Sequence, residues 1–342
     1  DYTSMLLKLD AYVPVNAPEN RPAILIIHGG GLQGGSRKAP QMVALSNYFA
    51  QRGWVAFSID YRLEGDKGST PAAWHDFAEN NASSFADAMS VYPASRDAKA
   101  AVRWVYANAD EYGINTGFIT ACGGSAGAYL SVTLGVSEDV DFTNELSLDE
   151  DPSLSTTNLN QTSKIHSIID FWGGGGHITG LYLVFGVQRF DATDAPILIV
   201  HGDSDPVVNF SQAEDLRDRY HATGADYEFH RLIGAGHGPC SSTGTSEVPH
   251  GSLSMIATAT VTWIRCTQTS TQHHAQKPTD IVRVAHSRGK GVFFPTSRRK
   301  HRGSSSRKKK RIPRQQRSQQ RSHVPPLLQR SQVPPSCSRG AG

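Results

Sequence analysis

The chain has 342 residues, with 34 Lys or Arg against 31 Asp or Glu, which gives a formal net charge of +3 at pH 7. No apolar run is long enough to predict a membrane-spanning helix, and four cysteines are too few for the disulfide framework of a small secreted domain. No spacing of cysteine and histidine is typical of a zinc site and no phosphate-binding loop occurs, so we expect neither a metal ion nor a cofactor.

The charge is divided unevenly along the chain. Residues 1–266 carry 16 basic and 30 acidic residues, whereas residues 267–342 carry 18 basic residues and one acidic residue. The first part is long enough for one large domain with a substantial core. The second part is rich in Arg, Lys, Gln, Ser and Pro and poor in apolar residues, so burial cannot offset the entropy lost on ordering. We therefore expect one folded domain over residues 1–266 and a basic, disordered, low-complexity tail over residues 267–342.

Short apolar runs alternate with helical patterns along the first part of the chain. The runs of strand length are residues 23–27, 55–59, 118–122, 165–171, 197–200 and 227–233. The helical patterns are residues 95–112, 126–136 and 252–265. This alternation predicts an α/β fold with a mostly parallel, doubly wound sheet and helices on both faces. In such a sheet the functional residues are expected at the carboxyl ends of the strands.

The first strand-like run ends in the tract His-Gly-Gly-Gly at residues 28–31. Glycines at the carboxyl end of a strand let backbone N–H groups approach a ligand closely, as an oxyanion hole requires. Taken alone, the tract would be an ordinary glycine-rich turn. Because a serine motif follows in the right chain order, we assign oxyanion donors to the N–H groups of Gly30 and Gly31.

That serine motif is Gly-Gly-Ser-Ala-Gly at residues 123–127, between an apolar run and a helical pattern of small residues. A strand, a tight glycine turn and a helix are typical of a nucleophile elbow. Ser125 is therefore the candidate nucleophile. The N–H group of Ala126, the residue after it, is the third expected oxyanion donor.

The acid that would orient a catalytic base lies in the turn after residues 197–200. Two aspartates compete there, and Asp205, deeper in the loop and followed by Pro206, is the predicted acid. Asp203 is expected instead to hydrogen-bond the turn.

The candidate base is His237, in a glycine loop that follows the run at 227–233. His177, which follows the glycines at 173–176, is the rival, but it precedes Asp205 and so breaks the expected order Ser, Asp, His. The remaining histidines considered are expected to be structural or solvated: His166, His221, His230 and His250.

Together these motifs resemble those of α/β-hydrolase carboxylesterases, in the esterase/lipase group that includes hormone-sensitive-lipase-like enzymes and bacterial-type feruloyl or acetyl-xylan esterases. Six segments carry the resemblance in chain order, at residues 28–31, 60–63, 97–104, 123–127, 201–208 and 234–238. The resemblance spans residues 6–265, and it implies a triad of Ser125, Asp205 and His237 that hydrolyses esters through an acyl-enzyme.

Two departures from the family pattern concern the substrate side. Leu32 follows the HGGG tract where relatives often carry an aromatic residue, and residues 137–163 carry no family signature. The polar stretch at 139–162 predicts a surface excursion or partial lid that supplies little core. Leu32 and Trp172 are the candidate pocket residues. The apolar residues near Trp172 would line an acyl or aryl pocket or form plain core, namely Phe171, Leu181, Tyr182 and Phe185.

Three functions are consistent with these residues. The favoured one is a serine carboxylester hydrolase acting on small or medium acyl or aryl esters, free or attached to a polymer. A serine peptidase or amidase on the same fold is the second, although the sequence contains no large gating domain. A non-catalytic hydrolase-fold binding protein is the third, and the full set of triad and oxyanion residues argues against it. The tail lacks the interleaved aromatics that stack on single strands, so nucleic-acid binding is not expected.

Location and cysteine pairing are predicted from few residues. The chain begins at Asp1 without an apolar targeting run, and it has sequons at Asn81, Asn160 and Asn209, which together favour a secreted or extracellular protein over a cytoplasmic one. Cys122 is expected to be buried in the strand before the elbow. Cys240 and Cys266 flank the last predicted helix and are a candidate disulfide pair.

Overall fold

The structure is a computed structural model, and it describes residues 5–15, 17–238 and 281–284. The predicted helix at 252–265, the candidate pair Cys240 and Cys266, and the boundary at residue 266 lie outside the described residues. So does the predicted tail, except for residues 281–284. Within the described part of the chain, no helix is both long and apolar enough to cross a bilayer.

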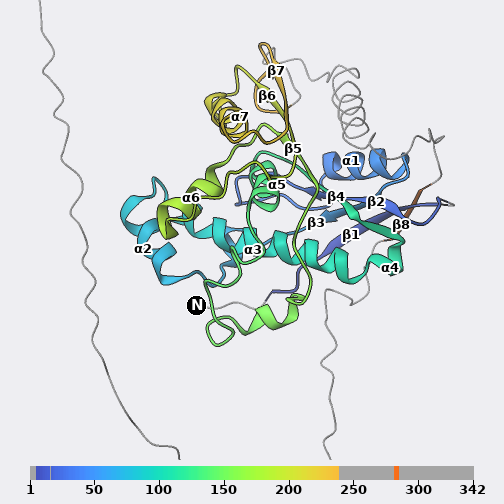
Figure 1. The fold of residues 1–342 in the computed structure, drawn as a ribbon, viewed down its shortest axis with the longest axis horizontal. Helices are drawn as coiled ribbons and strands as arrows, with labels where there is room; N and C mark the ends of the chain where they lie inside the picture. The colour runs from blue at the N-terminus through green and yellow to red at the C-terminus, as the bar shows by residue number, and fades with distance from the viewer. Residues whose placement is uncertain (1–4, 16, 239–280, 285–342) are drawn as a thin grey trace, which may run out of the picture. The chain divides into compact units, whose positions relative to one another are not determined.

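In the described part of the chain, a sheet of eight strands forms the centre of the fold (Figure 1). Its strands are β1 (Leu9–Pro14), β2 (Arg21–Ile27), β3 (Val55–Ile59), β4 (Ile114–Gly124), β5 (Ser167–Phe171), β6 (Ile197–Gly202), β7 (Tyr227–Leu232) and β8 (Ile281–Val284). Their order across the sheet is β7-β6-β5-β4-β2-β3-β1-β8. Strands β2 to β7 pair in parallel, whereas β1 is antiparallel to β3 and to β8. The predicted mostly parallel, doubly wound sheet is confirmed.

Strands β1 and β8 were not predicted. Strand β8 pairs with β1 from Pro14 opposite Ile281 to Ala11 opposite Val284, and it lies inside the range for which the sequence predicts a disordered tail. These four residues therefore depart from that prediction.

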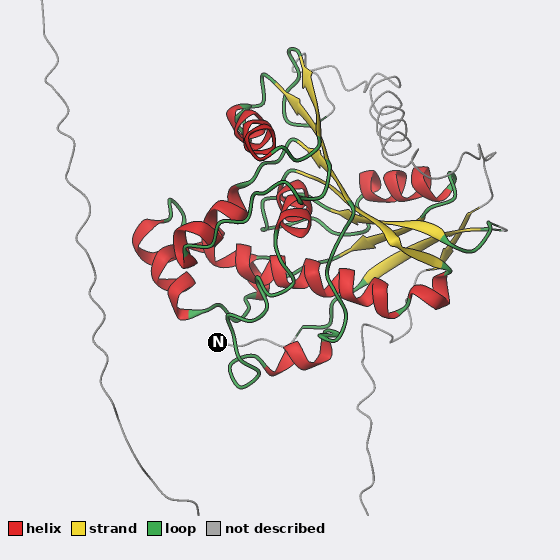
Figure 2. Cartoon of the chain, viewed as in Figure 1, coloured by secondary structure: helices red, strands yellow, loops and turns green. Residues whose placement is uncertain are grey.

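Helices cover both faces of the sheet (Figure 2). They are α1 (Pro40–Ala50), α2 (Ala72–Asn81), α3 (Phe85–Ala107), α4 (Ala109–Tyr112), α5 (Ala126–Val136), α6 (Gly176–Phe185) and α7 (Ser211–Thr223), with two short 3-10 helices, η1 (Glu64–Asp66) and η2 (Pro152–Thr156). Alternation along the strands feeds two cores, because successive side chains point to opposite faces. On β2, Leu25 packs in a core with Val102 of α3 and Leu130 of α5, whereas Ile24 packs in the other core with Phe49 of α1.

The helix predicted at 95–112 begins earlier and is interrupted. Helix α3 starts at Phe85, where the Ser84 side chain accepts a hydrogen bond from the Asp87 N–H, and it continues through Pro93. It ends at Ala107, and Asn108 separates it from α4. A proline is a helix-breaking signal in sequence, so the first half of α3 was missed. Helix α5, by contrast, has the bounds that the pattern at 126–136 predicts.

The polar segment at 137–163 is packed onto α3. Arg96 of α3 donates to Asp151 at 2.6 Å, and both side chains are buried. The Lys99 ammonium of α3 donates to the Glu138 carbonyl, and the Phe142 ring is fully buried in the core. The expectation that this segment supplies little core is therefore wrong. Buried charged side chains of α3 bind the segment to the domain, and the composition of the segment alone does not reveal these contacts.

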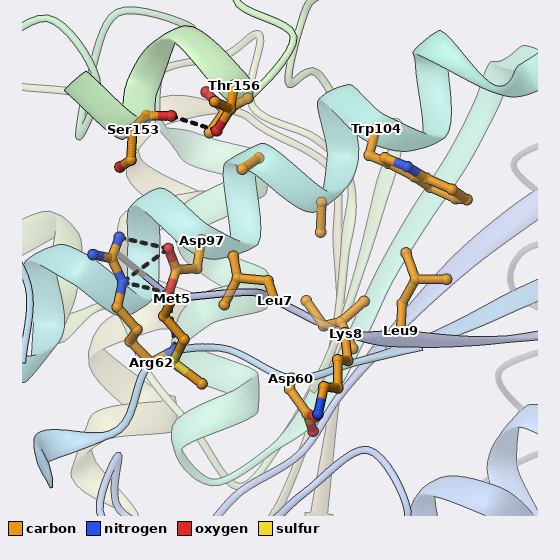
Figure 3. A pocket seen from close by; sticks show the side chains of 14 residues that line it. Met5, Leu7, Lys8, Leu9, Asp60, Arg62, Asp97, Trp104, Ser153 and Thr156 are labelled. Carbon is orange, nitrogen blue, oxygen red and sulfur yellow. Dashed lines mark hydrogen bonds and ion pairs between the residues drawn. The ribbon is translucent and has the colours of Figure 1, made fainter. Parts of the chain in front are cut away.

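Two family-like segments, at residues 60–63 and 97–104, serve the fold. The buried Arg62 guanidinium binds the Asp97 carboxylate with N–O distances of 2.7 to 3.1 Å, which ties the end of β3 to α3 (Figure 3). The pair lines a cavity of about 80 Å³ together with the stem of Lys8 and the Trp104 ring. Removing either partner would leave a buried charge without its counter-ion, which is strongly destabilising.

Candidate active site

Ser125 occupies the turn between β4 and α5. Its backbone has φ 55° and ψ −126°, a strained conformation for a residue with a side chain, and its N–H donates to the Phe171 carbonyl at 3.0 Å. A Cβ on Gly123 would lie 2.3 Å from the carbonyl group of Gly127. The motif glycines are therefore required because helix and strand crowd the turn, and Ser125 stands half-buried at the carboxyl edge of the sheet.

The glycine loop after β2 lies against this elbow. A Cβ on Gly29 would lie 3.2 Å from the Ser125 Cβ, so the two turns touch. Gly30 has φ +117° and Gly31 has φ +62°, conformations that favour glycine. Among the described residues, the N–H groups of Gly30, Gly31 and Ala126 have no hydrogen-bond acceptor. Three donors, one of them at the N-terminus of α5, are thus available to an anion beside the serine.

Tyr61 contacts His28 at the start of the glycine loop and so supports the loop, a role that the sequence did not predict. Its ring stacks on His28 with centroids 4.3 Å apart, and its hydroxyl donates to the His28 carbonyl at 2.8 Å. Tyr61 belongs to the family-like segment at 60–63, which was the available signal.

Asp205 and His237 are joined by a hydrogen bond in which His237 Nδ1 donates to Asp205 Oδ2 at 2.7 Å. The second carboxylate oxygen accepts the N–H groups of Val207 and Val208 at 2.8 and 2.9 Å. Burial opposes ionisation of Asp205, but the hydrogen bonds from His237, Val207 and Val208 outweigh it and lower the pKa of Asp205. An ionised acid bound to Nδ1 leaves the Nε2 of His237 as the atom that exchanges a proton.

The competing residues lie elsewhere. Asp203 accepts the Gly234 N–H at 2.7 Å and Arg231 Nε at 2.9 Å, so it ties the turn after β6 to the end of β7. His177 lies against the Tyr129 ring, at a centroid distance of 5.4 Å, and burial lowers its pKa to about 4. The structure thus joins His237 to Asp205 and gives Asp203 the turn-stabilising contacts expected of it.

Trp172 connects the elbow with the histidine. A Cβ on Gly124 would lie 3.1 Å from its indole nitrogen, and the indole meets the His237 ring edge-on at 6.4 Å. Trp172 therefore contacts the turn that carries Ser125 on one side and the His237 ring on the other. No hydrogen bond joins Ser125 to His237 among the described contacts, and such catalytic bonds often tighten only when substrate binds.

Leu32, the other candidate pocket residue, is buried in the core. It is 5% exposed and has φ 58°, and its carbonyl accepts the Glu64 N–H. Leu32 therefore contributes to the core, and its role in lining the pocket stays a prediction. Of the neighbouring apolar residues, Leu181 is fully buried in the core and Tyr182 is exposed.

A serine at a strained strand–helix turn, with an acid-bound histidine and unfilled amide donors at the same sheet edge, is the arrangement that distinguishes the α/β-hydrolase class. Comparison of the chain with family models agrees. The BD-FAE family model matches residues 9–88 and 84–179, and the Dienelactone hydrolase family model matches residues 186–264. The chain belongs to the BD-FAE family of α/β-hydrolase carboxylesterases, and the resemblance noted in the sequence is confirmed.

Two esterases of Mycobacterium tuberculosis are similar in sequence. Esterase LipC is 27% identical over 240 residues, a match that covers 64% of this chain and 53% of LipC. Esterase LipQ is 26% identical over 233 residues, covering 61% of this chain and 49% of LipQ. The chain thus spans about half the length of these relatives.

Solved structures of esterase 2 from Thermogutta terrifontis share the fold. The butyrate-bound form has a TM-score of 0.57 at 24% identity, and the form phosphorylated by paraoxon has a TM-score of 0.56 at 25% identity. Each match covers 76% of this chain and 89% of the esterase.

Proposed function

We propose that the chain is a serine carboxylester hydrolase that works through an acyl-enzyme on small or medium acyl or aryl esters. The observation that carries the proposal is the 2.7 Å bond from His237 to the buried Asp205, at the sheet edge that also holds Ser125 and three amide groups without an acceptor among the described residues. The esterase names of the relatives support the same reaction class.

The geometry suggests a separate role for each residue of the site. His237 Nε2 accepts the Ser125 hydroxyl proton while Ser125 Oγ bonds to the acyl carbon, and Asp205 stabilises the imidazolium that forms. The N–H groups of Gly30, Gly31 and Ala126 bind the oxyanion, and each such donor is worth about 3 kcal/mol in the transition state. His237 then gives its proton to the departing alcohol. Water, deprotonated by the same imidazole, attacks the acyl-enzyme and releases the acid and the free serine.

A nucleophilic serine is tested by replacement and labelling together. We expect Ser125→Ala to abolish hydrolysis of a short p-nitrophenyl ester and to abolish labelling by a fluorophosphonate. Ser204→Ala is the matched control, because Ser204 is an exposed serine in the loop after β6 that carries Asp205, called the acid loop below. This variant should keep both the hydrolysis and the labelling. A label that maps to another serine, or full activity in the Ser125 variant, would refute the assignment.

Trp172 is proposed as a wall of the acyl or aryl site, since its indole lies against both the elbow and His237. A separate cavity of about 580 Å³ lies between α2, α3, α6 and α7, and neither Trp172 nor a residue of the candidate triad lines it. Its size is within the range of small-molecule sites.

A secreted or extracellular location is a further part of the proposal. The side chains of Asn81, Asn160 and Asn209 are all exposed, as glycan attachment requires. Digestion of protein from its natural source with an N-glycosidase should lower its mass, and an unchanged mass would count against the proposal.

A further inference from the structure

The Asp205 carboxylate contacts two imidazoles. Besides the His237 ring, at 2.7 Å, the Nε2 of His201 lies 3.3 Å from the same oxygen, Oδ2. His201 is the penultimate residue of strand β6, and its side chain is completely buried. This second histidine has no part in the reaction scheme above, although it lies directly behind the acid.

The contacts of His201 define its protonation. Its Nε2 is also 2.9 Å from the Val208 carbonyl oxygen, so both neighbours of this nitrogen are acceptors and the nitrogen must carry a proton. Its Nδ1 is buried and has no hydrogen-bond partner among the described residues. Burial lowers the pKa of His201, and the bond to Val208 and the Asp205 charge oppose this only in part. The ring therefore carries a hydrogen on Nε2, and burial disfavours the addition of a second one at Nδ1.

The hydrogen on His201 Nε2 is part of a small hydrogen-bond network in the acid loop. Val208 presents its carbonyl to His201 and its N–H to Asp205 Oδ1, so one residue links the imidazole to the carboxylate. The Phe210 ring packs edge-on against His201 with centroids 5.9 Å apart, which limits rotation of the imidazole. Contacts with His201 and Val208 thus hold the Asp205 carboxylate in place on the side away from His237.

We propose that His201 is a positioning residue of the esterase site, whose Nε2–H holds the acid loop through Val208 and disperses part of the Asp205 charge, so that Asp205 binds His237 in the productive orientation. The inference rests on the proposed function for its kinetic test. Among the residues that the structure describes, the titratable groups that interact with Asp205 are His201 of β6, His237 of the loop after β7, and Tyr129 of α5. Tyr129 does not ionise near neutral pH, since burial raises its pKa to about 12.

The kinetic test compares two substitutions of His201. Phe keeps the ring volume and removes the donor, whereas Gln keeps an N–H near the position of Nε2. We expect His201→Phe to lower kcat for a short p-nitrophenyl ester about 10- to 100-fold with little change in KM, as for a small misplacement of a catalytic group. Its acidic limb in the pH profile of kcat/KM should move to higher pH, because a less satisfied carboxylate holds the His237 proton more strongly. His201→Gln should restore most of both.

A merely structural role predicts another result, in which both variants lose thermal stability while kcat and the pH profile stay at wild-type values. That result would overturn the proposal. A second measurement does not depend on activity or on the folding of a variant: nitrogen NMR of the wild-type full chain at about pH 8 should show His201 as the Nε2–H tautomer, because both neighbours of Nε2 are acceptors. An Nδ1–H tautomer would also overturn the proposal. Failure of the proposed function would appear separately, as a wild-type protein that hydrolyses no ester.

Discussion

Gly127 and Ile27 are in direct contact: a Cβ on Gly127 would lie 2.1 Å from the Ile27 carbonyl oxygen and 2.7 Å from that of His28. Helix α5 therefore begins directly on the carboxyl end of β2. This contact places the serine turn beside the glycine loop, and so it brings the proposed nucleophile close to the proposed oxyanion donors.

Replacement of Gly127 tests that contact. Because the atoms met by the new methyl group belong to the backbone, Gly127→Ala must shift either helix or strand, and we expect a loss of about 2 kcal/mol or more in the free energy of unfolding. Ester hydrolysis should fall with it. Urea denaturation gives the stability, and Gly65→Ala, in open space on η1, is the control that should change it little. Equal stability of the two variants would contradict the close packing.

The two aspartates of the acid loop make a matched pair of substitutions. Asp205→Asn should lower kcat about 10³- to 10⁴-fold, because the amide no longer supports the imidazolium or its tautomer. Asp203→Asn removes the same charge two residues away but only loosens contacts with Gly234 and Arg231, so kcat should stay within a few-fold. Steady-state kinetics with a p-nitrophenyl ester checks both. A larger loss in Asp203→Asn would reverse the assignment of the acid.

The two candidate pocket residues should respond differently to truncation. We expect Trp172→Ala to change the ratio of kcat/KM between aryl and short alkyl esters, since its indole borders the site. Leu32→Ala should instead destabilise the fold by about 2 kcal/mol or more, as buried leucines do, and leave that ratio unchanged. An ester panel and thermal unfolding of both variants provide the comparison. A changed ester preference in the Leu32 variant would show that Leu32 lines the substrate pocket.

Asp170 on β5 predicts how stability varies with pH. Burial raises its pKa to about 7 against the opposing bond from the Gly173 N–H, and its Oδ2 has no partner among the described residues. An aspartate in the unfolded chain ionises near pH 4, so between about pH 4 and 7 the native state binds more protons and its stability falls as pH rises. Asp170→Asn removes that loss.

The measurement is the free energy of unfolding of the Asn variant and of wild type, from urea denaturation between pH 5 and 8. The variant should gain on wild type as pH rises, with a difference on the order of 2 to 4 kcal/mol at pH 8. Asp191→Asn is the control, because hydrogen bonds from Thr193 lower the pKa of Asp191 and its contribution changes only in more acidic solution. A constant difference between Asp170→Asn and wild type would show that Asp170 is ionised throughout.

Local sequence pattern was sufficient for the elements whose signals are short-range. The glycines around Ser125 report crowding within one turn, and the alternation of apolar runs gave β3 and α5 their observed bounds. Strand β1 was missed because its short run, Leu9–Pro14, ends in a proline and lacks the continuous apolar character of the central strands. The first half of α3 was missed because of Pro93.

The sequence alone determined the class of fold, the candidate nucleophile and the order of acid and base, because each depends on residues that are neighbours along the chain. Tertiary structure decided the rest: that Leu32 turns into the core, that charges on α3 bind the segment at 137–163, and that His201 lies behind Asp205. These outcomes depend on which backbone atoms and charges meet across distant parts of the chain. No local periodicity records such contacts, since they arise only when the strands have been ordered into one sheet.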